Sequence, residues 1–527
     1  MVVDVNRCVG CQTCTISCKH ANDTVPGVQW RRVLDVESGS FPDVERLFLV
    51  VGCQHCAEPP CVPVCPTGAT RQRADGLVTM DYDVCIGCAY CAVSCPYQAR
   101  TIVHDERWYY GRETRQERQV AHDERLGVAQ KCTFCVTRVD DGLAAGLKPG
   151  VDPAATPACS ASCIAQAIHF GDFADPASNV STLVAENPSF QMHAELGTDP
   201  QIKYLYTTPA VPGREPAAED RDDERLSDPA NPLVGQLQSF WDWRAAMNWC
   251  FGGVSSGLVV MALLAALRGL VNPVRLPWID AGAAVLMAIG LFFVFLKIGR
   301  KLRFWRAVSR PGTSWMTREL YTTAVFYPAV LAALVWRHPA ALAVAALAAL
   351  VFLICQAMIL VKARGIPAWR APLIPWMIVA TGLLEGFGLL LAVGTFAGAT
   401  VWPGATLAVL GLALVAVNAA LWIAYRATAR ARGIGPLARN ALADASLPLH
   451  LVGHALPALM LVIALAVPEI ARGVMGVAGV AAIAGGAYWK FSVIVRAGFQ
   501  QGFALAKFPQ RGSGRRAAPP RLKAAAE

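Results

Sequence analysis

The placement of cysteine constrains this chain more than any other feature of its 527 residues. Sixteen of the eighteen cysteines stand in four tight groups, all before residue 164. The groups are Cys8, Cys11, Cys14 and Cys18; Cys53, Cys56, Cys61 and Cys65; Cys85, Cys88, Cys91 and Cys95; and Cys132, Cys135, Cys159 and Cys163. Two residues between successive cysteines let a tight turn present two or three thiolates to one small volume. This repeated spacing is typical of paired cubane iron–sulfur clusters.

The fourth cysteine of such a group, often followed by proline, reaches the neighbouring cluster. Cys65-Pro66 and Cys95-Pro96 have this ending. If the first group pairs with the fourth and the second with the third, the cysteines hold four 4Fe-4S clusters, numbered 1 to 4 here. The predicted ligands are Cys8, Cys11, Cys14 and Cys163 for cluster 1; Cys18, Cys132, Cys135 and Cys159 for cluster 2; Cys53, Cys56, Cys61 and Cys95 for cluster 3; and Cys65, Cys85, Cys88 and Cys91 for cluster 4. Because every position is a cysteine, no three-iron cluster is expected.

Disulfides and zinc compete for the same cysteines. Disulfides belong to exported proteins, and the N-terminus, MVVDVNRCVGC, shows neither a signal peptide nor a twin arginine. Zinc ribbons also use Cys-x-x-Cys pairs. The three-cysteine runs CVGCQTC and CIGCAYC and the Cys-Pro endings favour iron–sulfur clusters over zinc.

The cysteine groups lie in longer motifs. These are CVGCQTCTISC, CQHCAEPPCVPVCPTGA, CIGCAYCAVSCPY, KCTFC and CSASCIAQAIHFGDFADP, followed by NPSF, ELGTDP and IKYLY. Over residues 8–206 the chain resembles the four-cluster electron-transfer subunit of the dimethyl sulfoxide reductase superfamily of molybdenum enzymes. The resemblance implies an α+β ferredoxin-like iron–sulfur domain over residues 1–208, built from two pseudo-repeated bis-cluster units.

The rest of the chain is apolar. With 54% hydrophobic residues and a mean hydropathy of +0.39, the chain is too apolar for an ordinary soluble protein. Eight apolar stretches have the length that spans a bilayer: 247–267, 278–298, 321–337, 340–361, 373–394, 403–425, 447–467 and 474–495. We predict an all-α eight-helix transmembrane bundle over 245–496, with a linker at 209–244 and a basic tail at 497–527.

The basic residues between the stretches predict an orientation. Connections on the N-terminal side, with the C-terminal tail, hold twenty-one Lys and Arg residues, and the opposite side holds four. By the positive-inside rule this places the iron–sulfur domain and both termini in the cytoplasm, on the inner membrane. No nucleic-acid partner is expected.

Six side chains in or near the spans are candidates for contact with a quinone headgroup, because charged groups in a membrane are costly and usually functional. They are Arg318, Glu319, Glu385, His450, His454 and Lys490. Each has a structural alternative, such as an interfacial ion pair for Arg318 and Glu319 or a snorkelling side chain for Lys490. Trp241, Trp243, Trp249, Trp315 and Trp489 are expected to anchor the membrane interface.

Haem is not expected, because only His450 and His454 lie well inside spans, and both belong to one helix. Cys250 and Cys355 lie in apolar segments and are expected to be small core residues.

Two shorter motifs, GTSWMTRE at 312–319 and ARGIPAWR at 363–370, are similar to the polytopic anchor subunits of the same superfamily. The resemblance implies a fused electron-transfer and anchor subunit that carries electrons between a molybdopterin catalytic partner (molybdenum or tungsten) and membrane quinone. Oxidation of a cytoplasmic substrate is favoured, as in sulfite dehydrogenases or phenylacetyl-CoA:acceptor oxidoreductases. The alternatives are a quinol-oxidising subunit of a sulfoxide or polysulfide type of reductase, and a proton-translocating respiratory module.

Overall fold

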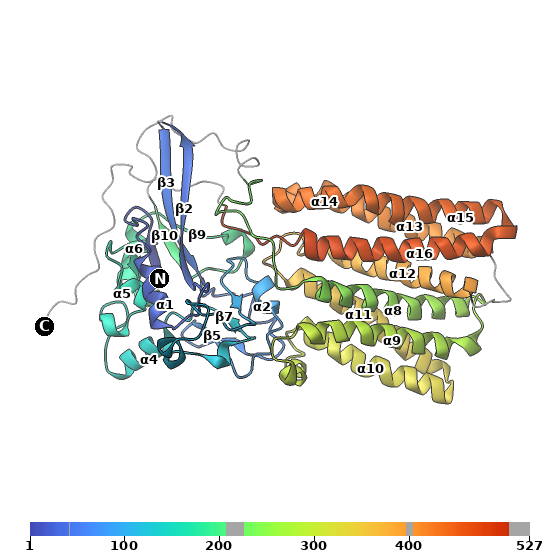
Figure 1. Cartoon of the computed structure of the whole chain (residues 1–527), viewed down its shortest axis with the longest axis horizontal. Helices are drawn as coiled ribbons and strands as arrows, with labels where there is room; N and C mark the ends of the chain where they lie inside the picture. The colour runs from blue at the N-terminus through green and yellow to red at the C-terminus, as the bar shows by residue number, and fades with distance from the viewer. Residues whose placement is uncertain (42, 207–225, 397–403, 505–527) are drawn as a thin grey trace. The chain divides into compact units, whose positions relative to one another are not determined.

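The computed structural model describes residues 1–41, 43–206, 226–396 and 404–504. It divides into two compact units (Figure 1). The first unit comprises Met1–Val62 and Ala69–Gln236, together with the chain from Gln501 onward. The second unit comprises Leu237–Gln500 and one short piece of the cysteine-rich half, Pro63–Gly68.

The first unit is built from small sheets and short helices. Its largest sheet has the strand order β8-β1-β10-β9, in which β1 is parallel to β10 and antiparallel to β8. The strands of this sheet are β1 (Val2–Asp4), β8 (Ile168–His169), β9 (Ser189–Gln191) and β10 (Lys203–Leu205). The sheet therefore joins the beginning of the chain to residues some 200 positions later, and Val3 pairs with Tyr204.

Three two-stranded ribbons surround this sheet. They are β2 (Arg31–Ser40) with β3 (Asp43–Gly52), β4 (Thr70–Gln72) with β5 (Val78–Met80), and β6 (Thr101–Ile102) with β7 (Ala129–Gln130). The helices are α1 (Thr13–Ala21), α2 (Tyr90–Val93), α3 (Arg115–Gln119), α4 (Val136–Ala144), α5 (Ala158–Ala161) and α6 (Asn179–Glu186). Short elements of this kind around buried cysteines confirm the predicted ferredoxin-like domain.

The second unit confirms the eight predicted spans. Six of them are single helices: α8 (Trp243–Leu267), α9 (Leu276–Lys297), α10 (Trp315–Trp336), α11 (Pro339–Lys362), α12 (Ile374–Phe396) and α13 (Gly404–Ala427). The seventh span runs through α14 (Pro436–Pro448), a π-helical segment (Leu449–Ala455) and α15 (Leu456–Ala466). The eighth is α16 (Ala471–Phe491), which continues into a second π-helical segment, Ser492–Arg496.

Two spans begin earlier than the apolar stretches predict. Helix α10 begins at Trp315 rather than near residue 321, and the seventh span begins at Pro436 rather than near 447. In both spans the first helical turns contain polar residues, so a prediction based on apolar stretches alone does not include them. Arg318 and Glu319 consequently lie within the first turns of α10.

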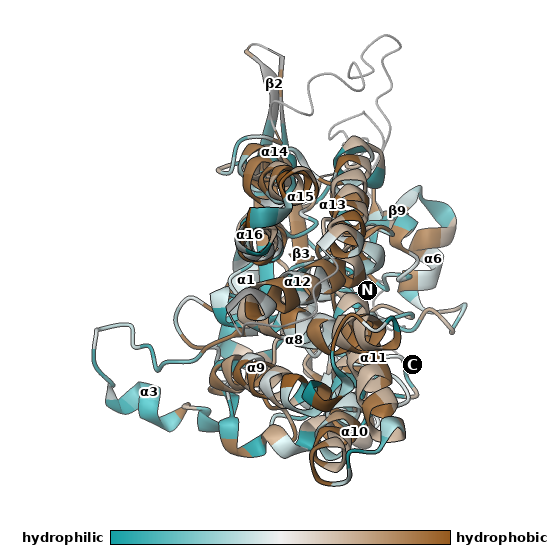
Figure 2. Ribbon diagram, turned by 90° about the vertical axis from the view of Figure 1, so that its right-hand side faces the viewer, coloured by the Kyte–Doolittle hydropathy of each residue, from teal (hydrophilic) through white to brown (hydrophobic). Residues whose placement is uncertain are grey.

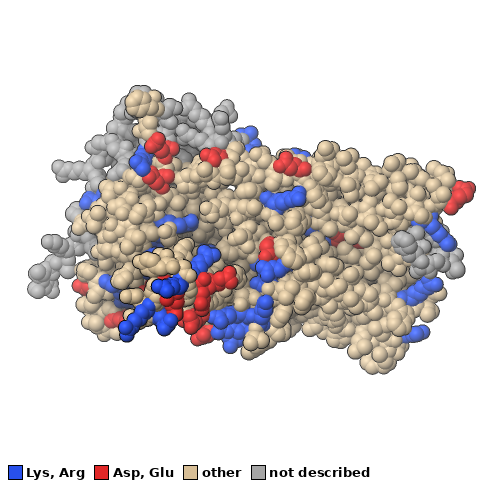
Figure 3. Space-filling view, in the orientation of Figure 1, with Lys and Arg blue, Asp and Glu red and all other residues tan. Residues whose placement is uncertain are grey.

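Viewed along the helix axes, α8 and α12 lie in the middle of the bundle (Figure 2). Glycines bring these two helices into backbone contact, as is common between helices in membranes. A Cβ atom on Gly257 of α8 would lie 1.8 Å from the carbonyl oxygen of Gly382 on α12. Few charged side chains lie over the middle of the spans on the face drawn in Figure 3, as expected for a surface in contact with lipid.

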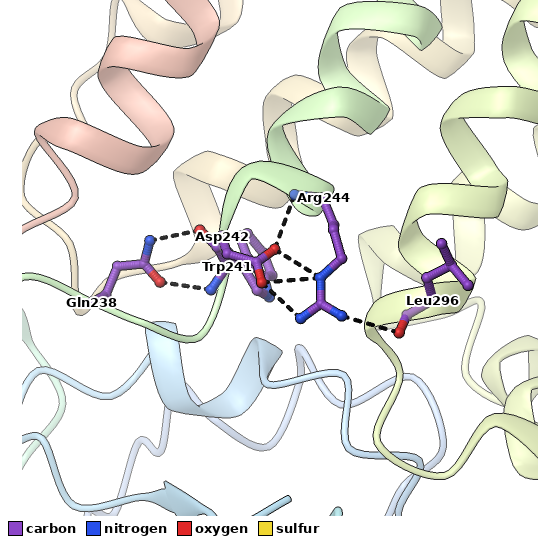
Figure 4. A network of polar contacts seen from close by, with 5 residues as sticks. All are labelled: Gln238, Trp241, Asp242, Arg244 and Leu296. Atoms are coloured by element: carbon purple, nitrogen blue, oxygen red, sulfur yellow. Dashed lines mark hydrogen bonds and ion pairs between the residues drawn. The ribbon is translucent and has the colours of Figure 1, made fainter.

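The approach to the first span is held by local polar contacts (Figure 4). The Gln238 side chain accepts a hydrogen bond from the Trp241 amide at 2.7 Å and donates one to the Trp241 carbonyl at 2.8 Å. Asp242 caps α8 by accepting from the Arg244 amide at 2.9 Å. The Arg244 guanidinium returns to Asp242 at 2.7 Å and also donates to the carbonyl of Leu296. These contacts fix where the chain enters the bundle.

Three of the tryptophans expected at the membrane interface are instead buried. Trp241, Trp249 and Trp489 are 2–3% exposed. Trp241 stacks on Trp369 and lies against Trp249, with ring centroids 5.5 Å apart in both pairs. The sequence interpretation was wrong for these three, because their position near a helix end does not reveal which side faces the protein.

Candidate cluster sites and the polar network of the spans

The first and third cysteine groups adopt the same turn. Gly10 and Gly87 both have φ of 70°, and Gln12 and Ala89, two residues later, have φ of 61° and 65°. Glycine adopts such left-handed backbone without strain. In each group the turn precedes a helix, α1 or α2, that carries the third cysteine in its first turn. The two groups thus have matching local geometry, as a pseudo-repeat requires.

Cysteines assigned to clusters 1 and 2 lie close together in the first unit. Burial, aided by the nearby thiols of Cys159, Cys8 and Cys163 and opposed by Arg31, raises the pKa of the Cys14 thiol to about 12. Burial also raises the pKa of Cys18, with added contributions from Cys132, Cys159 and Cys135. Cys163 therefore lies near the first group and Cys18 near the fourth, as the predicted exchange of ligands requires.

The cysteines assigned to cluster 3 are gathered in the same way. Burial raises the pKa of Cys95 to about 12, and Cys61 and Cys53 act in the same direction. Burial and the thiols of Cys53, Cys61 and Cys95 likewise raise the pKa of Cys56. Among the cysteines assigned to cluster 4, Cys85 and Cys91 are buried in the first unit, Cys88 is partly exposed, and Cys65 belongs to the Pro63–Gly68 segment of the second unit.

These thiols fit the chemistry of iron–sulfur ligation. All eighteen cysteines are free thiols in the structure. Within the residues that the structure describes, no three His, Cys, Asp or Glu side chains stand close enough to share one metal ion. A 4Fe-4S cube instead places one thiolate on each of four separate irons. Cys250 and Cys355 are both buried within the spans, where they were expected.

The backbone on either side of Cys65 is held by the start of α10. The Ser314 hydroxyl donates to the Val64 carbonyl at 2.9 Å. The Thr317 hydroxyl donates to the Ala307 carbonyl at 2.6 Å and lies 3.5 Å from the Pro66 carbonyl. Both hydroxyl-bearing residues are fully buried. One predicted cluster ligand is thereby tied to a span within the second unit.

Glu319, two residues after Thr317, is buried in an amide-lined site between α8, α10 and α11. Asn248 donates to Oε1 of Glu319 at 3.1 Å, and Gln356 donates to the Asn248 carbonyl at 2.9 Å. Oδ1 of Asn248 and Oε1 of Gln356 have no hydrogen-bond partner among the described residues. The quinone-site residues predicted from the sequence include neither Asn248 nor Gln356, although a buried amide within a span is itself a sign of a polar site.

Glu385 of α12 and Lys490 of α16 form a second polar site. Their side chains are fully buried and 2.5 Å apart, and Lys490 also donates to the Trp249 carbonyl at 2.9 Å. Trp249 Nε1 in turn donates to the Gln356 carbonyl at 3.1 Å. Asn248 and Trp249 are adjacent on α8, so one polar network joins Glu319 to Glu385 through the middle of the bundle.

The remaining candidates lie apart from this network. Nδ1 of His450 and Nδ1 of His454 are 3.2 Å apart on the π-helical segment. His454 lines a cavity together with Asn418, Trp422 and Trp489. Arg318 is partly exposed and donates to the carbonyls of Pro311 and Gly312, with its guanidinium 4.3 Å from the centre of the Trp315 ring.

Two family models match the chain. Residues 44–109 match the 4Fe-4S dicluster domain. Residues 247–434 match the DMSO reductase anchor subunit (DmsC). The first match lies in the first unit except for Pro63–Gly68, and the second match lies in the second unit, as the predicted fusion of an iron–sulfur subunit with an anchor requires.

Curated relatives match the cysteine-rich half. A protein of Halobacterium salinarum, named as a dimethyl sulfoxide reductase iron–sulfur subunit, is 38% identical over 46% of this chain and 93% of its own length. A sulfite dehydrogenase subunit of Allochromatium vinosum is 38% identical over 39% of this chain and 81% of its own. The iron–sulfur cluster-binding subunit of menaquinone reductase from Nitratidesulfovibrio vulgaris is 35% identical over 39% of this chain and 87% of its own.

Proposed function

The chain belongs to the family of iron–sulfur subunits of the dimethyl sulfoxide reductase superfamily, continued by an anchor of the DmsC type, and we propose that it relays electrons between a molybdopterin catalytic partner and membrane quinone. It is an electron-transfer subunit with a multi-pass membrane anchor. We propose in addition a molybdopterin catalytic partner, a set of four clusters and a quinone site.

The proposed relay contains four 4Fe-4S clusters with the ligands predicted from the sequence. The neighbouring thiols around Cys14, Cys18, Cys56 and Cys95 support this assignment for clusters 1 to 3. When bound, such clusters accept and release single electrons. The protein's own part is to supply thiolates in buried turns and to exclude water around them.

We place the quinone headgroup at Glu319, with Asn248 and Gln356 as its polar neighbours. The observation that carries this placement is the start of α10, where Ser314 donates to the Val64 carbonyl, the Thr317 hydroxyl lies 3.5 Å from the Pro66 carbonyl, and Glu319 follows two residues later. Reduction of a quinone consumes protons as well as electrons, and a buried carboxyl group can donate them. The unpaired Oδ1 of Asn248 and Oε1 of Gln356 can accept hydrogen bonds from a quinol.

The distribution of basic residues supports a cytoplasmic iron–sulfur unit. This orientation favours a substrate that is met inside the cell, and the direction we propose is oxidation of that substrate with reduction of quinone. The opposite direction, oxidation of quinol for a sulfoxide or polysulfide type of reductase, is the alternative. A proton-translocating module is a third candidate, favoured by the fully buried Glu385–Lys490 pair.

The test uses the purified full-length chain in detergent. Iron and acid-labile sulfide are expected at about sixteen each per chain, four for each cube. Reduced clusters are expected to be reoxidised by a water-soluble menaquinone analogue. A wild-type chain with full iron and no reaction with the analogue would overturn the quinone assignment.

Glu319→Gln locates the site. This variant should slow the quinone reaction about a hundredfold or more at unchanged iron content, within the range that a positioned proton donor contributes. Glu469→Gln, an exposed carboxyl at the start of the last span, is the matched control and should react like the wild type. Equal rates for the two variants would exclude Glu319 from the site.

A further inference from the structure

Three cationic side chains are buried among the cysteines of the first unit. Arg31 and Lys131 are 0% exposed and Arg100 is 4% exposed. Placing a charge in a protein interior is costly unless a charge of opposite sign lies nearby. The most strongly interacting neighbours of all three include cysteine thiolates. Each of these three buried cations therefore has cysteine sulfur atoms as its neighbours of opposite charge.

Arg31 lies against the predicted ligands of cluster 2. Its strongest charged neighbours are Cys159, Cys132 and Cys18, three of the four ligands assigned to that cluster, and it hydrogen-bonds Cys159. Nη2 of Arg31 lies 3.4 Å from Sδ of Met1. Nε and Nη1 have no hydrogen-bond partner among the described residues.

The opposing strand leaves room for this guanidinium. Arg31 pairs with Gly52 in the β2–β3 ribbon. A Cβ atom on Gly52 would lie 2.7 Å from the Trp30 carbonyl oxygen and 3.1 Å from Nη1 of Arg31. Any larger residue at position 52 would therefore press on the backbone and on the arginine.

Arg100 has the same relation to cluster 3. Its strongest charged neighbours are Cys61, Cys91, Cys53 and Cys95. Three of them are predicted ligands of cluster 3, and Cys91 is a predicted ligand of cluster 4. Its Nη1 donates to Oγ1 of Thr70 at 3.1 Å, and Nη2 has no partner within the described part of the chain. Lys131 lies between the two sites, because its neighbours include Cys53 and Cys132.

An unpartnered N–H group in an apolar interior costs free energy, and a cluster sulfur is an acceptor that would satisfy it. A cube with four thiolate ligands carries net negative charge, and one added electron increases that charge. A fixed positive charge close by favours the reduced form, as do hydrogen bonds to the sulfurs, so both raise the reduction potential. Arginine keeps its charge at every working pH.

We propose that Arg31 and Arg100 set the reduction potentials of clusters 2 and 3 respectively, by directing buried guanidinium N–H groups at the sulfurs of one cluster each. Neither residue binds iron, and no bond is made or broken. The proposal rests on the cluster assignment of the proposed function. Its consequence is that two clusters of the relay are tuned by separate, replaceable side chains.

The test is a redox titration of the full-length chain followed by electron paramagnetic resonance. In Arg31→Gln the reduced-to-oxidised ratio of one cluster is expected to fall at least tenfold at a given potential, a shift of about 59 mV for one electron. Arg100→Gln should shift a different cluster by a similar amount. Cys135→Ser and Cys56→Ser identify which signals belong to clusters 2 and 3. Arg46→Gln, at an exposed arginine that pairs with Asp35, is the control and should shift neither.

Outcomes for the proposal and for the proposed function are distinguishable. Wild-type protein without iron–sulfur signals would overturn the proposed function. Full iron content with unmoved potentials in both glutamine variants would overturn only the tuning proposal. If a glutamine variant fails to assemble, Arg31→Lys and Arg100→Lys decide, because lysine keeps the charge but loses the planar fork of donors. Each should give a smaller shift of the same sign in its own cluster, and no shift in either would overturn the proposal.

Discussion

Lys490 donates a 2.5 Å hydrogen bond to Oε2 of Glu385, and both side chains are completely buried in the span bundle. Lys490 has a second acceptor in the Trp249 carbonyl, whereas Oε1 of Glu385 has no partner among the described residues. Glycines make space for the pair: a Cβ atom on Gly253 would lie 2.0 Å from Nζ of Lys490, and one on Gly486 would lie 2.3 Å from Oε1 of Glu385. The pair therefore occupies a site shaped by α8, α12 and α16.

Removal of one member of this pair should destabilise the protein strongly. Glu385→Gln or Lys490→Met leaves the other group buried and uncompensated, which costs about 3–5 kcal/mol. The double variant should recover much of that loss, because no unpaired charge remains. Thermal unfolding in detergent measures the effect, and Glu469→Gln is the exposed control. Equal stability of the single and double variants would show that the two charges are not coupled.

Contact between α8 and α12 should not tolerate a single added methyl group at Gly257. Gly257→Ala places Cβ 1.8 Å from the Gly382 carbonyl oxygen, so the helices must move apart. Overpacking of this kind costs about 1–3 kcal/mol. Gly282→Ala in α9 is the matched control, because nothing lies within 4 Å of its added Cβ. The control should match or exceed wild-type stability in thermal unfolding, since alanine is the better helix former. A stable Gly257→Ala variant would contradict the packing described.

Thiol reactivity after removal of iron should differ within the first cysteine group. The side-chain hydrogen bond between Cys11 and Thr13 lowers the pKa of the exposed Cys11 thiol, whereas burial raises the pKa of the Cys14 thiol to about 12. Only the thiolate reacts with iodoacetamide, so at a given pH near 8 Cys11 should be labelled well before Cys14. Raising the pH should narrow the difference. Mass spectrometry of quenched samples measures both sites, and labelling in denaturant provides the reference in which the two react alike. Equal rates in the absence of denaturant would contradict the burial of Cys14.

The sequence predicts the fold of each half of the chain better than it predicts which side chains pack against one another. Cysteine spacing and span length are local patterns, so the ferredoxin-like domain and the eight spans follow from them. Burial of Trp249 depends on which face of α8 packs against neighbouring helices, and a stretch that is apolar on all sides does not indicate this face. Asn248 and Gln356 escape notice because an uncharged amide does not interrupt an apolar stretch. Nothing around Cys65 indicates that its six-residue segment packs with the spans.

The hydroxyl groups at the start of α10 should affect electron transfer more than stability. The Ser314 hydroxyl donates to the Val64 carbonyl, and the Thr317 hydroxyl donates to the Ala307 carbonyl and lies 3.5 Å from the Pro66 carbonyl. Val64 and Pro66 flank Cys65, a predicted ligand of cluster 4. Ser314→Ala combined with Thr317→Val frees this segment at a cost of about 1–3 kcal/mol for each acceptor left unsatisfied. Small misplacements of a reacting group can slow a reaction by two orders of magnitude, so reoxidation of the clusters by a quinone analogue should slow at least tenfold.

A control on the same helix separates this effect from general damage to α10. Among the described residues the Thr322 hydroxyl bonds only the Glu319 carbonyl of its own helix, at 2.7 Å, so Thr322→Val should leave the rate within about twofold of wild type, as expected for a side chain without a role in the transfer. Stopped-flow absorbance of prereduced protein measures the rates, and iron content confirms that all clusters are present. If the double variant transfers electrons at the wild-type rate with full iron, the contacts of Ser314 and Thr317 are structural only. If the double variant instead loses about four irons per chain, the content of one cube, the hydroxyl groups of Ser314 and Thr317 are needed for the assembly of cluster 4. Their role then precedes electron transfer.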